Sequence, residues 1–186
     1  MVDLFNYTRR TSSVAHVGEL DLGGNNPIRI QSMTTTNTND TEACVRQAEE
    51  IIKAGGELVR FTTQGSREAE NMKNINAGIR ADGFTTPLVA DIHFNPNVAD
   101  VAALYCEKVR INPGNYVDPA RKFIKQEYTD EEYAHELQKI EERFVPFLNI
   151  CKENHTAIRI GVNHGSLSDR IRNRYGDTPE GIVESC

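Results

Sequence analysis

The sequence lacks any long hydrophobic run. Its apolar segments are only a few residues long, whereas a helix that spans a bilayer needs about 20 apolar residues. The first ten residues, MVDLFNYTRR, also lack the apolar stretch of a secretory signal. We therefore expect a cytoplasmic protein with no membrane partner.

Paired cysteines and an excess of positive charge are absent as well. The formal net charge is −6, which argues against a nucleic-acid partner because such surfaces usually present a net basic face. A local basic pocket is still compatible with this charge. The four cysteines form no C-x-x-C pair, so neither a zinc site nor a disulfide framework is encoded locally. We expect reduced thiols and no bound metal at Cys44, Cys106, Cys151 and Cys186.

What the sequence does contain is a regular alternation of short apolar segments and helix-like stretches. Hydrophobic residues make up 38% of the chain and charged residues 26%, which is ordinary for a soluble globular domain. Alternation of this kind is typical of βα units that build a parallel sheet. The apolar segments are PIRIQSMT from Pro27, ELVRFTT from Glu57, PLVADIH from Pro87, KVRINPG from Lys108 and AIRIGVN from Ala157.

Apolar spacing and capping residues place helices between these segments. They predict a helix that ends at Gly55, helices over about 66–81 and 96–106, and a longer one that begins after Thr129. Pro146 should kink or split the long helix. A further helix should begin at Thr178, just before the sequence ends.

These elements predict an α/β fold made of about five βα units. A complete eight-stranded TIM-type (β/α)8 barrel takes about 250 residues, so 186 residues would form the N-terminal part of one. We expect residues 1–186 to be a single partial barrel domain. An open five-stranded sheet is the alternative.

Arginine stands in the middle of four of the five expected strands. Side chains alternate between the two faces of a strand, so the aliphatic neighbours point one way and the arginine the other. Because the aliphatic residues need the helix layer, the arginines should face the barrel interior. The four segments are Ile28-Arg29-Ile30, Val59-Arg60-Phe61, Val109-Arg110-Ile111 and Ile158-Arg159-Ile160.

The same alternation turns other polar residues inward. Thr62 follows Arg60, Asn112 follows Arg110, and Asn163 follows Arg159 on the same side of each chain segment. Unpaired buried cations cost several kcal/mol each. Arginines beside asparagines therefore favour a multiply charged anion, and the planar guanidinium suits a phosphate group. Arg29 lies early in its strand and is interpreted as structural.

Asp91 and His93 share one face of the third expected strand. One aspartate cannot balance all the inward arginines, although some of them could pair with Asp91, with Glu57 or with acids outside this sequence. A lone histidine is more commonly a hydrogen-bonded core residue. Beside Asp91 and an anion, His93 becomes a candidate proton donor.

Five segments taken together resemble a known enzyme family. They are IQSMTTT, LVADIHF, VRINPGN, RIGVNHGSLS and GDTPEGIVES, in this order. As a set they resemble the 4-hydroxy-3-methylbut-2-enyl diphosphate synthases of the methylerythritol phosphate route to isoprenoids. The resemblance implies an oxidoreductase that opens the ring of 2-C-methyl-D-erythritol 2,4-cyclodiphosphate and removes a hydroxyl group. It also implies a [4Fe-4S] cluster and a ferredoxin or flavodoxin-type electron donor.

The resemblance assigns roles to individual residues. It implies catalytic roles for Asp91 and His93, and weaker support for Ser32 and Thr34 in the first-strand motif. No family function is carried over to Arg29. The substrate-binding positions that match the family are Arg60, Arg110, Asn112, Arg159 and Asn163.

Two departures from the family pattern matter. The family holds its cluster with three cysteines and a glutamate in a C-terminal domain, and nothing in this sequence matches that domain. The cysteines present are therefore not assigned as ligands, and the chain alone is expected to be inactive. The long YTDEEYAHELQKIEERF connection resembles the three-domain branch of the family, and the missing transit peptide favours a bacterial source.

Three further expectations complete the interpretation. Sheet edges left open at the first and fifth strands invite pairing with another copy, so a homo-oligomer is expected. A pterin- or phosphate-binding barrel synthase would use the same inward polar groups without a cluster. A binding half-barrel without enzymatic activity is the third possibility.

Overall fold

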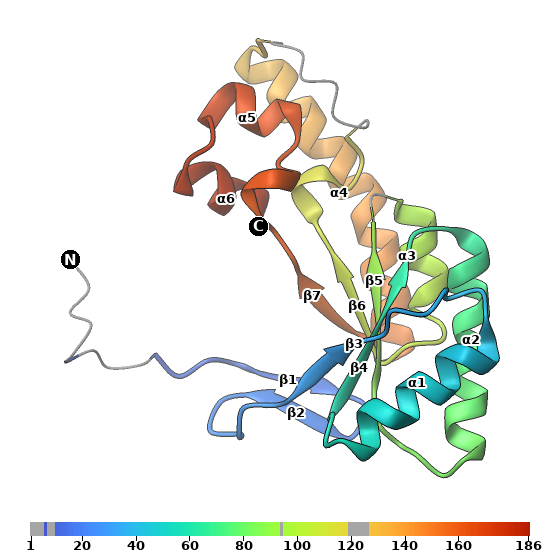
Figure 1. The fold of residues 1–186 in the computed structure, drawn as a ribbon. Coiled ribbons are helices and arrows are strands. Elements are labelled where there is room, and N and C mark those ends of the chain that lie inside the picture. The colour runs from blue at the N-terminus through green and yellow to red at the C-terminus, as the bar shows by residue number, and fades with distance from the viewer. Residues whose placement is uncertain (1–5, 7–9, 94, 119–126) are drawn as a thin grey trace.

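A parallel five-stranded sheet forms the centre of the molecule (Figure 1). The computed structural model describes residues 6, 10–93, 95–118 and 127–186. The spatial order of the strands follows their order in the chain, with β3 and β7 at the two edges. The strands are β3 (Gln31–Met33), β4 (Leu58–Thr63), β5 (Leu88–Ile92), β6 (Lys108–Ile111) and β7 (Ala157–Ile160). Each falls within one of the five expected segments.

Helices follow each strand, as the alternation predicts. Among the described residues no helix is both long and apolar enough to cross a membrane. The α-helices are α1 (Thr41–Lys53), α2 (Ser66–Ala81), α3 (Pro96–Ala102), α4 (Asp130–Glu153), α5 (Asp169–Tyr175) and α6 (Pro179–Ser185). Two short 3-10 helices, η1 (Pro113–Asn115) and η2 (His164–Ser166), follow β6 and β7.

The helix α4 runs through Pro146 without a break, so the expectation of a split helix is wrong. Aromatic packing on both sides of the proline supplies the reason. The ring of Tyr116 lies 5.3 Å from that of Phe144 and 5.9 Å from that of Phe147, measured between ring centroids. These contacts hold both halves of the helix against the same surface, which offsets the lost backbone hydrogen bond.

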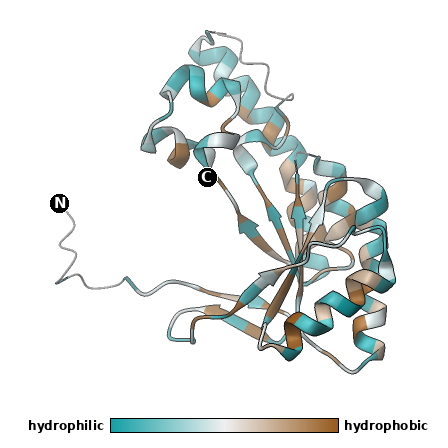
Figure 2. Cartoon of the chain, in the orientation of Figure 1, coloured by the Kyte–Doolittle hydropathy of each residue, from teal (hydrophilic) through white to brown (hydrophobic). Residues whose placement is uncertain are grey.

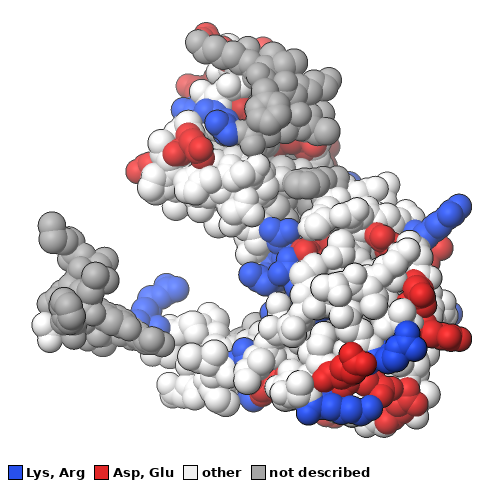
Figure 3. All heavy atoms as spheres, in the orientation of Figure 1, with Lys and Arg blue, Asp and Glu red and all other residues white. Residues whose placement is uncertain are grey.

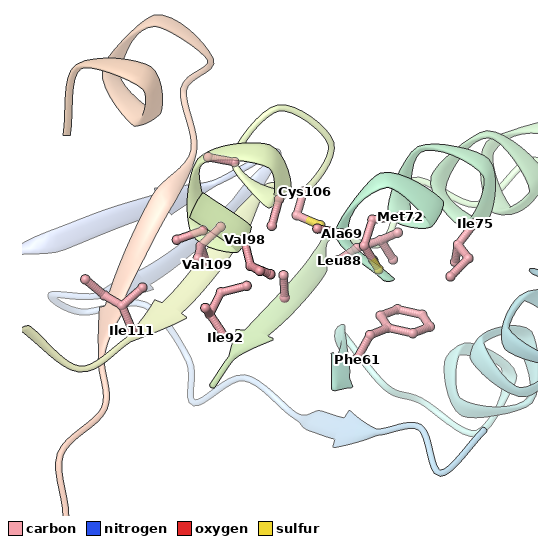
Figure 4. Close-up of a cluster of buried hydrophobic side chains, with 14 of the residues drawn as sticks. Phe61, Ala69, Met72, Ile75, Leu88, Ile92, Val98, Cys106, Val109 and Ile111 are labelled. Atoms are coloured by element: carbon pink, nitrogen blue, oxygen red, sulfur yellow. The ribbon is translucent and has the colours of Figure 1, made fainter. Parts of the chain in front are cut away.

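The hydrophobic core lies between the sheet and the helices. Val59 and Phe61 on β4, and Val109 and Ile111 on β6, are buried between the sheet and the helices. Figure 4 labels three of these side chains, Phe61, Val109 and Ile111. Arg60 and Arg110, which alternate with them, lie on the opposite face and are partly exposed. Hydrophobic and hydrophilic residues are accordingly mixed along the same strands (Figure 2). The predicted alternation is confirmed for these two strands.

The first strand does not follow the predicted pattern. Ile28 and Ile30 are 88% and 61% exposed, and β3 begins only at Gln31. The reason is Glu57, whose carboxylate accepts hydrogen bonds from Arg29 Nη1 at 2.8 Å and from the Ile30 backbone N–H at 2.9 Å. These bonds lower the pKa of Glu57, with the Ile30 bond the larger cause. Arg29 is therefore structural, as predicted, but its aliphatic neighbours do not face the helices.

An antiparallel hairpin precedes the sheet and was not predicted. It consists of β1 (Val14–Val17) and β2 (Leu20–Gly23). Gly18 opens the two-residue loop with φ of 58°, a position that favours glycine in tight hairpins. The hairpin packs against the inner side of the sheet near the strands' N-terminal ends, through Val17, Leu20, Leu22, Leu58, Val89 and Ala157. It closes that end of the inner face.

Replacing Phe61 by alanine should destabilise the protein by about 3–5 kcal/mol, because a large aromatic side chain that is fully buried leaves a cavity. Denaturant unfolding followed by circular dichroism measures the change. Leu104→Ala is the matched control, since Leu104 is 49% exposed and its loss should barely move the midpoint. Equal midpoints for the two variants would contradict the assigned core.

Candidate functional site

The polar residues predicted to face inward lie in two neighbouring rows across the sheet. Residues paired in register on parallel strands point to the same face. One row contains Arg60, Val89, Lys108 and Ala157, and the next row toward the strand ends contains Thr62, Asp91, Arg110 and Arg159. The structure therefore brings together the arginines and the aspartate that the sequence singled out.

Asp91 is the anionic centre of these rows. Its side chain is only 2% exposed, and it forms an ion pair with Arg60 Nη2. Arg110 Nη1 lies 3.3 Å from Asp91 Oδ1, and His93 Nε2 lies 3.3 Å from Asp91 Oδ2. Pairing with Asp91 is thus realised for two arginines at once. Because one carboxylate carries one negative charge, these groups retain a net positive charge.

Arg110 is fixed by a close fit to β7 as well. Its Nη2 donates a hydrogen bond of 2.9 Å to the carbonyl oxygen of Gly161. A Cβ atom placed on Gly161 would lie 2.0 Å from Arg110 Nε, so no larger residue fits there while the arginine keeps its place. Gly161 and Asp91 together determine where the guanidinium of Arg110 points.

Arg159 and Lys108 extend the cationic surface. Arg159 is exposed on β7, and Lys108 is partly buried at the start of β6. Burial, followed by the positive charges of Arg159 and Arg60, lowers the pKa of Lys108. Basic atoms gather in the hollow beside the sheet (Figure 3). Sequence reasoning missed Lys108, although its place two residues before Arg110 in KVRI puts it on the same face.

His93 is oriented from two sides. Its Nδ1 lies 3.3 Å from the side-chain amide nitrogen of Gln64, and its Nε2 faces Asp91 at 3.3 Å. When the Gln64 amide donates to Nδ1, the ring proton of a neutral imidazole lies on Nε2, toward the carboxylate. Gln64 was also missed, although it continues the series Arg60, Thr62, Gln64 along one side of the chain.

Asn112 and Asn163 shape the loops at the strand ends. Asn112 Oδ1 accepts hydrogen bonds from the Gly114 N–H and from Ser185 Oγ, both at 3.1 Å. Its amide nitrogen donates to Ser166 Oγ at 3.2 Å. Asn163 Oδ1 caps η2 by accepting from the Ser166 N–H at 3.1 Å. Both asparagines, with His93 and Arg110, line a cavity of about 180 Å³ at the carboxyl ends of β5, β6 and β7.

A buried arginine holds this loop region in place. Arg170 on α5 is 2% exposed. It donates to the Gly114 carbonyl oxygen at 3.1 Å and pairs with Asp118 Oδ2 at 3.3 Å. Its guanidinium also lies over the ring of Tyr133, 4.9 Å from the centroid. Through Arg170, α5 determines the position of the segment that follows β6.

Two weaker candidates do not reach the cavity. Ser32 is paired in register with Val59, whose side chain packs on the helix side, so Ser32 shares that face. Thr34 is buried, and both its backbone N–H and its hydroxyl donate to the carbonyl oxygen of Arg60, at 2.9 and 3.4 Å. Thr34 therefore joins the end of β3 to β4.

The fold and the site define a class of protein. Strands in chain order, helices outside, and polar residues at the carboxyl ends of the strands are the features of a parallel α/β barrel domain with a cationic binding face. The family model described as the GcpE TIM-barrel domain matches residues 11–186. The chain belongs to this family, which confirms the predicted barrel-type fold.

Curated relatives of this chain share one description. The chain is 76% identical over 185 residues to the 4-hydroxy-3-methylbut-2-en-1-yl diphosphate synthase (flavodoxin) of Phocaeicola vulgatus, and 74% identical to that of Bacteroides thetaiotaomicron. Both matches cover 100% of this chain but 30% of the relative. The Leptospira interrogans protein of the same description is 51% identical over 182 residues, with 98% and 27% covered. The chain thus spans about 30% of the length of these relatives.

Solved structures give a looser likeness. Dihydropteroate synthase of Burkholderia cenocepacia matches with a TM-score of 0.49 and 15% sequence identity, over 94% of this chain and 75% of that one. A likeness at this level has no bearing on function.

The described residues do not fit an iron-sulfur cluster. Cys44, Cys106 and Cys151 are buried, and Cys186 is exposed. In the part of the chain that the structure describes, no three or more histidine, cysteine or acidic side chains gather as metal ligands. Burial raises the pKa of all three buried thiols, that of Cys151 to about 12, and metal ligation requires the thiolate. The three buried cysteines are therefore structural.

Replacing Asp91 by asparagine should destabilise the protein by about 3–5 kcal/mol, because it leaves two partly buried arginines beside each other without their carboxylate. Denaturant unfolding measures the loss. Glu136→Gln, which breaks the more exposed pair with Lys139 on α4, is the control and should have little effect. A D91N variant as stable as E136Q would show that Asp91 does not hold these arginines.

Replacing Gly161 by alanine should displace the Arg110 side chain, since the new methyl group would overlap the guanidinium. Overpacking of this kind typically costs about 1–3 kcal/mol. Gly165→Ala is the control, because the nearest atom to a Cβ there is 3.4 Å away. A crystal structure of the variant reports the arginine's position, and an unmoved Arg110 would contradict the fit.

Proposed function

We propose that this chain is the substrate-binding domain of a 4-hydroxy-3-methylbut-2-enyl diphosphate synthase, an oxidoreductase of isoprenoid biosynthesis. The proposed ligand is 2-C-methyl-D-erythritol 2,4-cyclodiphosphate. The observation that carries this proposal is the unbalanced charge on the inner face of the sheet. Arg60, Arg110 and Arg159 lie together there with one carboxylate, Asp91. A diphosphate would supply the negative charge needed to balance these arginines.

The arginines would bind the diphosphate in complementary ways. Arg60 and Arg110 are held by Asp91, so their orientation is set before a ligand arrives, while guanidinium N–H groups not used by Asp91 can donate to phosphoryl oxygens. Arg159 is exposed beside Arg110 and can close over the ligand. Asn112 keeps the loop after β6 in place, and Asn163 lines the same cavity. Because both asparagines line this cavity, both would contact a substrate bound in it.

Asp91 and His93 would supply acid–base chemistry at this site. The imidazole lies at the cavity wall, with Nε2 directed to Asp91. An imidazole at this place can donate a proton to an oxygen that leaves the substrate. Asp91 would act by orienting His93 while it keeps the two arginines in position.

Turnover would require parts that the relatives have and this chain does not match. The chain spans about 30% of their length, and its own cysteines do not fit a cluster. We propose that the [4Fe-4S] cluster of the family, which supplies electrons when bound, is held outside this domain. The electron donor would be a flavodoxin, as the relatives' description states, or a ferredoxin. The domain alone would bind substrate without converting it.

The setting of the protein is part of the same proposal. A bacterial cytoplasm suits an enzyme that receives electrons from a small soluble carrier. The edge strands β3 and β7 would be covered by pairing or packing with other chain segments, including those of a second copy in a homo-oligomer.

Isothermal titration calorimetry with the cyclodiphosphate tests the proposed ligand. Arg159→Ala should weaken binding by about tenfold to a hundredfold, because a hydrogen bond to a charged group contributes about 1.5–3 kcal/mol. Arg67→Ala, at an exposed position of α2, is the control and should bind like the unaltered chain. Unchanged affinity in R159A, with circular dichroism showing a folded protein, would refute the anion site.

A further inference from the structure

The proposed function leaves one lysine of the cationic surface without a ligand contact. Lys108 lies two residues before Arg110 on β6, so both side chains point to the same face. Register places Lys108 in the same row as Arg60 on β4. Arg159 lies on the neighbouring strand β7, one row closer to the carboxyl ends. Lys108 therefore stands between two arginines.

The carboxylates near Lys108 are already engaged. Asp91 pairs with both Arg60 and Arg110. Glu107, the preceding residue, pairs with Arg80 at 2.8 Å and accepts the Leu88 N–H at 2.7 Å on the other side of the strand. Among the described residues, Lys108 and Arg159 have no ion pair with an acid. Two neighbouring cations thus stay unneutralised, next to a cluster that already has an excess of positive charge.

Such an arrangement is unfavourable in the absence of a ligand. A lysine paired with an acid would have a raised pKa, whereas burial and the two arginines lower the pKa of Lys108. Its surroundings therefore oppose its charge. A structural role would call for an acid or an apolar residue at this position, like the neighbouring Val89 and Ala157 in the same row.

We propose that Lys108 and Arg159 form a second anion subsite, which takes one phosphoryl group of a diphosphate while the Arg60–Asp91–Arg110 cluster takes the other. This inference rests on the proposed function and adds to it a division of the diphosphate between two sets of cations. The flexible stem of Lys108 brings a compact ammonium charge to the ligand, and Arg159 adds a planar fork of donors. Diphosphates would then be preferred over single phosphates of similar size.

Lys108→Met tests the subsite, because methionine keeps the unbranched stem and removes the charge. Calorimetry with inorganic pyrophosphate and with inorganic orthophosphate reports the affinities. We expect K108M to lose about tenfold or more for pyrophosphate, as expected for a lost charge-assisted contact, and much less for orthophosphate. Lys73→Met, at an exposed position of α2, is the matched control and should leave both affinities unchanged.

A second readout separates a ligand-binding lysine from a structural one. In the absence of ligand, K108M should unfold at a higher temperature than the unaltered chain, because the variant relieves repulsion among Lys108, Arg60 and Arg159. A lower unfolding temperature together with unchanged pyrophosphate affinity would overturn the proposal and make Lys108 a structural residue.

Combining substitutions tells the two proposals apart. Residues that contact the same phosphoryl group should show non-additive losses, so K108M/R159A should lose less affinity for pyrophosphate than the product of the single effects. If R159A loses affinity but K108M does not, the second subsite is wrong and the proposed function stands. If the unaltered chain binds neither pyrophosphate nor the cyclodiphosphate, both proposals fail.

Discussion

One buried carboxylate, that of Asp91, determines the charge arrangement on which the inner face depends. It pairs with arginines from strands on both sides, β4 and β6, and also faces His93. Without it, the guanidinium groups would repel each other at a site that is largely shielded from water, where charges interact more strongly than in solvent. With it, they are fixed yet not neutralised. Rigidity and residual positive charge therefore come from the same ion pairs.

The two ends of the sheet use charge differently. At the N-terminal side Arg29 pairs with Glu57 and Arg80 pairs with Glu107, and the hairpin β1–β2 packs apolar residues on the inner face. Toward the carboxyl side of the inner face, Arg60, Arg110 and Arg159 lie with one carboxylate, that of Asp91, and asparagine side chains hold the loops. Chemistry in barrels is located at the carboxyl side, and the surplus charge lies there too. The balanced end stabilises the fold, and the unbalanced end is available to a ligand.

Strand alternation was enough to predict the inward arginines, because burying Val59, Phe61, Val109 and Ile111 on the helix side leaves one direction for Arg60 and Arg110. The same argument failed at Ile28 and Ile30, where a distant residue, Glu57, decides the backbone path. The expected split of the helix at Pro146 was wrong for a similar reason. Tyr116, whose ring packs on Phe144 and Phe147 on both sides of the proline, is far from Pro146 in the sequence. Local patterns thus gave the faces of the strands, while the exceptions depend on tertiary contacts. The hairpin and Lys108 are different, because VAHV-GE-LDLG and KVRI already contain their signals.

The arrangement has a consequence for stability. A chain selected only for folding would balance its inner face, whereas here Arg110 even requires that Gly161 have no side chain. Leaving Lys108 without an acid would lower the stability of the unliganded domain, because the charge pairing of this lysine is given up. A polyanion would reverse the electrostatic part of this loss, since it binds the folded state and not the unfolded chain. The unpaired charges that would lower the stability of the unliganded domain are thus the charges that a diphosphate would neutralise.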